Sequence, residues 1–200
     1  MNKITLAGEV ITGPIFSHAI FGEKFYIFFM ESLRGSNKPD ILPCIVPEIY
    51  LKKIALKETV KILGEIRTIN KHKEDKRKVE VFVFVKEVVP YEGYDENAVE
   101  INGFICKTPN YRKTPLGKQI TDFVATSNRR YGRTDYVPSI AWGRNAVKVS
   151  EFLVGTEFNA KGRLQSREYT KRYPDGSSEK KIAYELSMSE IEEVADADNS

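Results

Sequence analysis

The sequence has few of the residues from which catalytic and metal sites are built. Its 200 residues include two cysteines and two histidines. His18 and His72 stand apart, the carboxylates are scattered, and there is no glycine-rich phosphate-binding motif. Cys44 and Cys106 lack metal-ligand spacing, and we expect each to be a buried, reduced thiol. We therefore expect a protein that is not an enzyme and needs no cofactor or metal.

Long hydrophobic runs are also lacking. No apolar stretch reaches the roughly 18 residues that a membrane helix needs. Met1 leads directly into alternating, strand-like sequence rather than into a signal peptide. We expect a cytoplasmic protein without a membrane partner.

The net charge of +3 is small but unevenly placed. Residues 1–95 hold 15 Lys and Arg against 13 Asp and Glu, which gives +2. Residues 96–189 hold 16 against 10, which gives +6, and residues 190–200 hold none against 5, which gives −5. A basic segment before an acidic one suggests a polyanionic partner such as nucleic acid. Many solvated surfaces carry a similar excess, so charge alone leaves both interpretations open.

Two halves of the chain align without a gap when each residue is laid on the residue 95 positions later. Eleven of 53 aligned positions are identical, whereas chance would give about three. The identities lie at Asn2, Gly8, Pro14, Gly22, Phe28, Ser32, Arg34, Asp40, Pro43, Ile45 and Lys53 and at the positions 95 further on. A repeat of this length predicts two domains, each large enough for its own core.

The pattern of the second repeat predicts five strands and one short helix. The strands are expected at residues 99–106, 118–127, 135–143, 158–169 and 182–189. Val149, Phe152 and Leu153 follow helical spacing and indicate a helix over residues 145–154, between the third and fourth strands. Residues 108–117, with two prolines, are expected to form a loop. This order of elements is typical of the OB fold, a small, partly open barrel.

The first repeat shows the same order of elements, with its helix expected at residues 49–56. We therefore expect an all-β protein with short helices, built from two tandem five-stranded OB-fold barrels. The expected divisions are a first domain at 1–90, a linker at 91–96, a second domain at 97–193 and an acidic, disordered tail at 194–200.

The expected fourth strand of the second repeat carries the clearest binding signal, because side chains two apart share a face. One face consists of Lys161, Arg163, Gln165, Arg167 and Tyr169. Cations follow phosphates and an aromatic ring stacks on bases, so this face suits single-stranded nucleic acid. A solvated strand face with an incidental tyrosine accounts for the pattern equally well.

The expected third strand leaves two interpretations open. One of its sides carries Tyr136, Pro138, Ile140 and Trp142, and the other carries Val137, Ser139 and Ala141. By hydrophobicity the aromatic side would be core, because tryptophan is usually well buried. Alternatively, the two aromatics form an exposed platform on which bases stack.

Several segments of the second repeat follow one another in an order known from one family. They are Asn97 with Ile101–Gly103, TPNYR at 108–112, VATSN at 124–128, DYVPSIAWG at 135–143, and KGRLQSR at 161–167 followed by Tyr169 and Asp175-Gly176. In these segments the second repeat, from Asn97 to about Glu193, resembles the bacterial single-stranded-DNA-binding proteins.

The resemblance implies sequence-tolerant binding of single-stranded DNA in replication, recombination or repair. Tyr136, Trp142 and Tyr169 would stack on bases. Arg112, Arg163, Arg167, Lys171 and Arg172 would neutralise phosphates, and Arg130, with Tyr131 beside it, replaces a further family aromatic. Four barrels are the family's usual assembly, so two barrels per chain imply a homodimer.

The first repeat lacks the stacking residues that the resemblance assigns to the second. At the offset of 95 its equivalents of Tyr136 and Trp142 are Ile41 and Pro47. The match resumes three residues later, where Gly64 meets Gly162, and at this offset of 98 the equivalent of Tyr169 is Lys71. We therefore expect the first domain to add little DNA affinity and mainly to pack against another barrel.

The family's C-terminal aromatic tip, which recruits replication and repair proteins, has no counterpart in the final residues Asn199 and Ser200. Recruitment of such partners by the usual route is therefore not expected. Two alternatives to DNA coating stay open: a replication-restart accessory that bridges proteins, and an OB-fold interaction module that binds no DNA.

Overall fold

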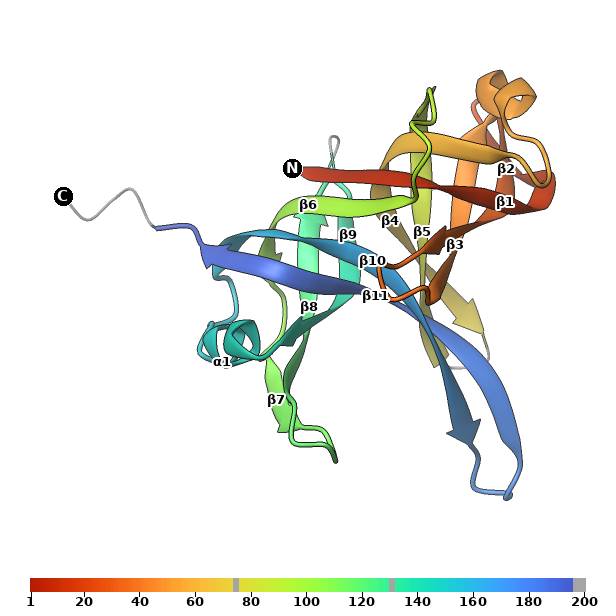
Figure 1. Cartoon of the computed structure of the whole chain (residues 1–200). Coiled ribbons are helices and arrows are strands. Elements are labelled where there is room, and N and C mark those ends of the chain that lie inside the picture. Colours follow the sequence, from red (N-terminus) through yellow and green to blue (C-terminus); the bar gives the residue numbers. More distant parts are fainter. Residues whose placement is uncertain (74–75, 130–131, 196–200) are drawn as a thin grey trace.

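Each half of the chain folds into a β-barrel in the computed structural model, which describes residues 1–73, 76–129 and 132–195 (Figure 1). The strands of the first barrel are β1 (Asn2–Ile20), β2 (Glu23–Leu33), β3 (Pro39–Pro47), β4 (Thr59–Lys73) and β5 (Lys76–Val89). Those of the second are β6 (Glu96–Ile105), β7 (Asn110–Lys113), β8 (Gln119–Asn128), β9 (Thr134–Trp142), β10 (Glu157–Arg172) and β11 (Ser178–Glu193). The described helices are the 3-10 helix η1 (Glu48–Lys53) and the α-helix α1 (Arg144–Ser150).

Both barrels close in the same way. In the first, β1 pairs with β2 and β4, β2 pairs with β3, β4 pairs with β5, and a parallel pairing of β3 with β5 completes the ring. In the second, β6, β8, β9, β11 and β10 form the equivalent ring. Each barrel has its helix between the third and fourth main strands, which is the arrangement of the OB fold. The predicted class, two tandem OB folds, is confirmed.

Close approaches between strands explain two glycines that the repeats share. A Cβ atom on Gly8 would lie 2.0 Å from the carbonyl oxygen of Glu31, and one on Gly103 would lie 2.4 Å from that of Thr126. A side chain at Gly8 would therefore force β1 away from β2, and one at Gly103 would force β6 away from β8. This requirement accounts for glycine at the same place in both halves.

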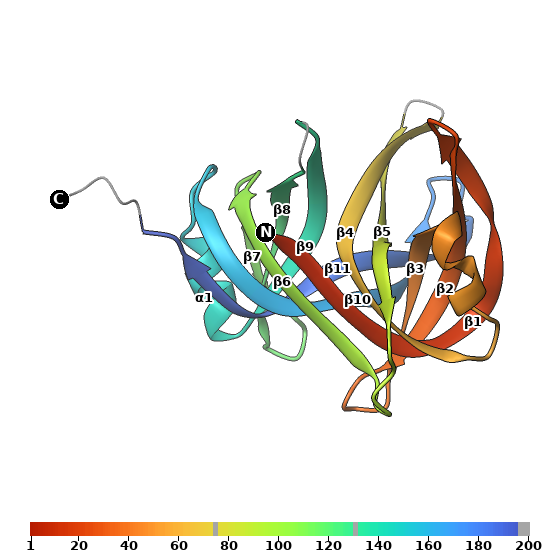
Figure 2. The same ribbon diagram turned by 90° about the horizontal axis from the view of Figure 1, so that it is seen from above.

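The barrels join edge to edge through their first strands. β1 and β6 pair antiparallel, with Ile4 opposite Val99. These residues are equivalent in the repeat, so the pairing is symmetric about them. Figures 1 and 2 show β1 and β6 side by side, and one sheet runs through both barrels in the order β5-β4-β1-β6-β10-β11.

Equivalent Arg–Asp pairs hold each barrel to a strand of the other. Arg34 Nε donates to Asp40 Oδ2 at 2.7 Å, and Asp40 Oδ1 accepts from the backbone N–H of Ser166 in β10 at 2.8 Å. The same arrangement in the opposite direction is formed by Arg129, Asp135 and Thr68. Both aspartates are fully buried. The identities at Arg34 and Asp40 in the repeat thus reflect a cross-barrel clamp.

The helices are shorter than predicted. The helix expected at residues 49–56 is the 3-10 helix η1, in which Tyr50 and Leu51 are partly buried against the core. It ends at Lys53 because the backbone of Ile54 is extended. The helix expected at 145–154 ends at Ser150. Phe152 is buried and Leu153 is exposed, so these two residues do not share the predicted apolar face.

The strands differ from the predictions mainly in segments where buried and exposed residues do not alternate. The expected loop at 108–117 contains β7, whose four residues are all exposed but pair with β8. The β10–β11 hairpin is longer at both ends than predicted, because its polar ends continue the pairing. Val194, in the expected tail, donates its N–H to Glu157 O at 2.9 Å, and residues 196–200 lie outside the described residues.

The cysteines differ from each other in burial. Both are free thiols, and Cys44 is buried in the first barrel as predicted. Cys106 is only partly buried, so the prediction of full burial is wrong there. It follows β6 directly, where the chain leaves the core.

Within the described ranges, no helix has the length and apolar character needed to cross a membrane.

Candidate nucleic-acid interface

The aromatic side of β9 faces outward. Val137 and Ala141 are fully buried in the core of the second barrel, whereas Tyr136 and Trp142 are each 40% exposed. Because alternate side chains of a strand point to opposite faces, burying one row turns the other to the surface. Hydrophobicity alone would place Tyr136 and Trp142 in the core, and that interpretation is wrong. Both aromatic side chains lie on the outside of the barrel, whereas Ile140 of the same row is buried.

Trp142 and Tyr169 contact different parts of the β10–β11 pair. The indole Nε1 of Trp142 donates to Ser187 Oγ of β11 at 3.2 Å, which fixes the ring while leaving much of it accessible. Ser187 pairs with Arg163 of β10, so the tryptophan lies near this strand. Further along β10, Tyr169 is 38% exposed, and the guanidinium carbon of Arg167 lies 5.9 Å from its ring centroid. Such a contact is a weak cation–π interaction.

Arg112 is held by a carboxylate on its own barrel. Its Nε and Nη2 donate to the two carboxylate oxygens of Asp122 at 2.6 and 3.2 Å. This hydrogen bond, and the negative charges of Asp122 and the nearby Glu185, raise the pKa of Arg112. Arg112, which was predicted to contact a phosphate, is therefore exposed but already forms an ion pair with Asp122.

Arg167 is paired in the same way with Glu185 of β11. Its Nε donates to Glu185 Oε1 at 3.2 Å, and Gln165 Nε2 donates to the same oxygen at 2.8 Å. Glu185 is only 9% exposed and Gln165 is also buried. The predicted cationic face of β10 thus has a buried amide, that of Gln165, at its centre, with the buried carboxylate of Glu185 beside it on β11.

Arg163 faces the junction with the first barrel. Its Nη2 donates to Gln165 Oε1 at 3.0 Å, and its Nε lies 3.8 Å from Asp40 Oδ2. Within the described part of the chain this Nε has no hydrogen-bond partner. Burial, followed by the charge of Arg34, lowers the pKa of Arg163. The residue is therefore partly committed to the barrel junction.

Two of the remaining predicted residues lie at one end of the interface. Lys171 and Arg172 are close to the tip of the β10–β11 hairpin, and Lys171 Nζ lies 5.1 Å from the ring centroid of Tyr173. Arg130 and Tyr131 lie outside the described residues. The structure therefore brings Tyr136, Trp142, Arg112, Arg163, Arg167 and Tyr169 onto one barrel wall, with the hairpin cations further out.

Sequence reasoning missed the two acidic partners, Asp122 and Glu185. Each lies on a strand other than that of its arginine, and neither spacing nor composition pairs them. Only the registers of β7 with β8 and of β10 with β11 bring these charges together.

The equivalent wall of the first barrel has different chemistry. Ile45, which corresponds to Ile140, packs with Phe25 and Phe82 in a small cluster outside the main core. The guanidinium carbon of Arg67 lies 3.5 Å from the ring centroid of the adjoining Phe84. Phe25, Ile45 and Phe82 are each buried, so among the described residues this part of the wall has no exposed aromatic ring equivalent to Trp142.

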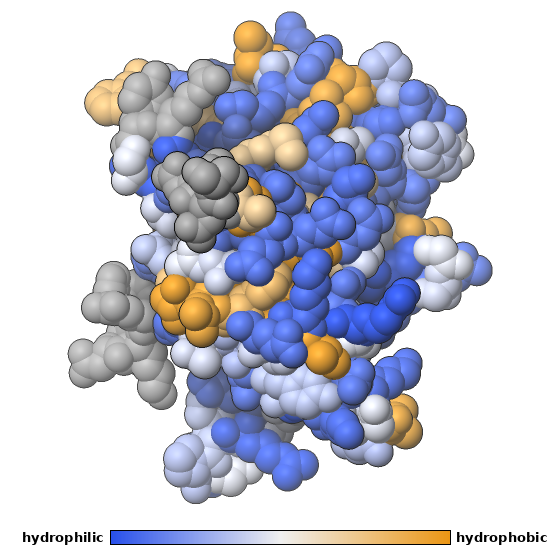
Figure 3. All heavy atoms as spheres, turned by 90° about the vertical axis from the view of Figure 1, so that its left-hand side faces the viewer, coloured by the Kyte–Doolittle hydropathy of each residue, from blue (hydrophilic) through white to orange (hydrophobic). Residues whose placement is uncertain are grey.

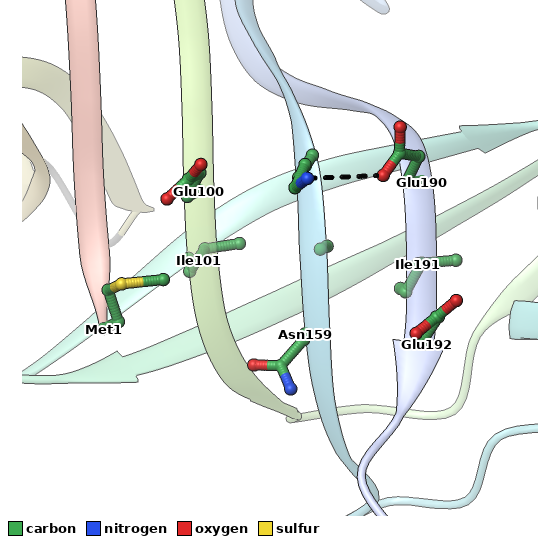
Figure 4. A pocket seen from close by; sticks show the side chains of 9 residues that line it. Met1, Glu100, Ile101, Asn159, Glu190, Ile191 and Glu192 are labelled. Atoms are coloured by element: carbon green, nitrogen blue, oxygen red, sulfur yellow. Dashed lines mark ion pairs between the residues drawn. The ribbon is translucent and has the colours of Figure 1, made fainter.

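A hollow of about 260 Å³ on the second barrel is unsuited to phosphates (Figure 4). Glu100, Glu190 and Glu192 line it, and Lys161 Nζ lies 3.8 Å from Glu190 Oε2. The carboxylates would repel a polyanion. Figure 3 shows the side of the molecule on which this barrel lies nearest to the viewer, and it is mostly hydrophilic with small, separate apolar patches. This hollow is therefore not part of the candidate interface.

Metal ligands do not gather anywhere in the chain as far as the structure describes it. No three His, Cys, Asp or Glu side chains come together there in a way that could hold an ion.

Comparisons with known proteins bear on the family of the second barrel. The model of the single-strand binding protein family matches residues 96–194. Single-stranded DNA-binding protein A of Bacillus subtilis is 32% identical over 80 residues, which cover 36% of this chain and 46% of that protein. Single-stranded DNA-binding protein 1 of Staphylococcus aureus is also 32% identical over 80 residues, with 48% of its length covered. The chain spans about half the length of the curated relatives it matches.

A solved structure supports the fold of the whole chain. The wild-type single-stranded DNA binding protein from Thermus aquaticus matches with a TM-score of 0.79 and 18% identity, covering 100% of this chain and 96% of that one. At this identity the likeness shows the fold, and the family is shown by the match to the second barrel. Through residues 96–194, the chain belongs to the single-strand binding protein family.

Proposed function

We propose that the second barrel binds single-stranded DNA with little sequence preference. The observation that carries the proposal is the orientation of β9, which turns Tyr136 and Trp142 outward while Val137 and Ala141 fill the core. Large aromatic side chains at the surface stack on any base, since every base has a π-face. Family membership and the names of the curated relatives support the same conclusion.

The proposed mechanism combines stacking with exchange of ion pairs. Bases stack on Tyr136, Trp142 and Tyr169, which lie along one barrel wall. Phosphates displace the carboxylate of Asp122 from Arg112 and that of Glu185 from Arg167. Lys171 and Arg172, near the tip of the hairpin, neutralise further phosphates. Arg163 neutralises a phosphate at the junction between the barrels. Because cations neutralise phosphates and release counterions, affinity falls as salt rises.

Titration with oligo-dT tests this proposal directly. Trp142 is the single tryptophan of the chain, so its fluorescence reports on the candidate interface alone. We expect quenching on binding and an affinity that decreases steeply with salt. Absence of both would contradict the proposal.

We further propose that the chain acts in replication, recombination or repair as a homodimer with four barrels. The symmetric pairing of β1 with β6 supports an assembly built from equivalent barrels. Light scattering should give a mass twice that of the 22.8 kDa chain. A monomeric mass at working concentration would contradict the homodimer.

A second candidate function is protein interaction through the tip of the β1–β2 hairpin. This tip exposes the apolar side chains of Ile15, Phe16, Ile20 and Phe21. Replacement of Phe16 and Phe21 by serine would leave DNA affinity unchanged if the two functions are separate. Capture of a replicative helicase by the wild type, and loss of that capture in the variant, would establish this function.

A further inference from the structure

We propose that the groove between the two barrels is a second site for bases of the same DNA strand. The inference rests on the proposed function and assigns the first barrel a part in it. The expectation from sequence was that the first barrel adds little affinity, because it lacks equivalents of the stacking residues. The groove uses other residues of that barrel.

The groove has a volume of about 690 Å³, within the roughly 300–1,000 Å³ typical of sites for small ligands. One wall is the β10–β11 hairpin, which extends across to the first barrel, where β10 contacts β3 and β11 contacts β5 (Figure 1). The other wall belongs to the first barrel. Its principal apolar lining residues are Phe29, Ile45 and Ile69 on one side and Tyr169 and Ile182 on the other.

The groove is continuous with the candidate interface through Tyr169. This tyrosine lines the groove and also stands at the end of the β10 row that begins at Arg163. Arg167 adjoins its ring, and Lys181 is its partner across the hairpin. A DNA backbone that follows β10 from Trp142 therefore reaches the groove with cations still beside it. Its next bases would then face the apolar wall.

The chemistry of the lining suits a nucleobase better than a purely apolar ligand. Apolar side chains can cover the faces of a base, while Ser17 and His18 offer hydrogen-bonding groups to its edges. Ser17 Oγ and His18 Nδ1 lie 3.0 Å apart, and the imidazole stacks on Phe25 at 5.0 Å between ring centroids. Glu80 and Glu185 also line the groove, and Glu185 already accepts from Gln165 and Arg167.

Photocrosslinking of the full chain tests where the bases lie. The probe is an oligo-dT in which single thymines are replaced in turn by 5-iodouracil, and crosslinked peptides are identified by mass spectrometry. We expect crosslinks to first-barrel peptides that contain His18 or Phe29, in addition to Tyr169. Crosslinks confined to the second barrel would overturn the proposal.

A matched pair of uncharged variants provides the affinity test. Ile69→Asn changes an exposed side chain in the groove, and Ile49→Asn makes the same change in η1, away from the groove. We expect Ile69→Asn to weaken oligo-dT binding about fivefold through the lost apolar contact, and Ile49→Asn to have no effect. Equal affinities for the two variants would overturn the proposal.

Trp142→Ala distinguishes failure of the groove from failure of the proposed function. If Trp142→Ala loses affinity while Ile69→Asn behaves as Ile49→Asn does, only the groove is excluded. If Trp142→Ala binds as well as the wild type, both proposals are overturned. Dissociation of a dimer by Ile69→Asn without a change in DNA affinity would also overturn the groove site, and would make it an interface between copies of the chain.

Discussion

Arg112 and Arg167 each hold a carboxylate on the wall where DNA is proposed to bind. An arginine that is already paired offers less to a phosphate than a free one, because the incoming phosphate must displace the carboxylate. The wall therefore attracts DNA less strongly than the same number of unpaired arginines would. Asp122 and Glu185 limit the affinity.

We predict that Asp122→Asn binds oligo-dT about two- to fivefold more tightly, because an exposed ion pair is worth about 0.2–1 kcal/mol. The released arginine should also steepen the dependence of log K on log salt by up to about 0.7. Fluorescence titrations at several salt concentrations measure both effects. Glu151→Gln, which removes an exposed charge at the end of α1, is the matched control. Weaker binding by Asp122→Asn would mean that Asp122 orients Arg112 for DNA.

Trp142→Ala is predicted to reduce DNA affinity by about 1–3 kcal/mol, the usual contribution of one stacked base. The indole donates a hydrogen bond to Ser187 and is 40% exposed, so stability should change little. Fluorescence anisotropy of labelled oligo-dT measures the loss, and Trp142→Phe should retain part of the affinity. An unchanged affinity would remove Trp142 from the interface.

The two cysteines should differ in reactivity. Burial raises the pKa of the Cys44 thiol, so it is protonated as well as inaccessible. We predict that iodoacetamide at mildly alkaline pH modifies Cys106 in the native chain and Cys44 only after unfolding, as read by peptide mass spectrometry. Equal modification of both in the native chain would contradict the burial of Cys44.

Among the elements, β9 and the β10–β11 hairpin determine the form of the interface. β9 supplies the aromatic row because its other row is needed for the core. The hairpin extends past its own barrel, so the cations near its tip lie far from Trp142. The sequence shows that two rows of side chains alternate along β9. It does not show which row faces the core, because both rows are largely apolar. The length of the hairpin was missed because its charged end shows no periodic burial.

The whole molecule is held together by elements that cross between the repeats. The pairing of β1 with β6 and the two Arg–Asp clamps connect the barrels, and the two clamp aspartates are fully buried. A buried charge that loses its partner is strongly destabilising, whereas an exposed pair is worth little. The clamps should therefore dominate the electrostatic contribution to stability.

We predict that Arg129→Ala lowers the free energy of unfolding by about 3–5 kcal/mol, because Asp135 stays buried without its cation. Arg112→Ala, which breaks the exposed pair with Asp122, is the control and should cost under about 1 kcal/mol. Urea denaturation followed by circular dichroism compares the two variants. Similar losses would show that the clamp is no more important than a surface pair.

The sequence by itself determined that the chain is a duplicated OB fold, because the repeat and the alternation of apolar residues are local properties of the chain. It also located Tyr136, Trp142 and Tyr169 as candidates through family resemblance. Tertiary structure alone decided which side of β9 faces outward, which carboxylates hold Arg112 and Arg167, and where a groove opens beside Tyr169. These features depend on barrel closure and on strand register, which bring together residues that no local pattern connects.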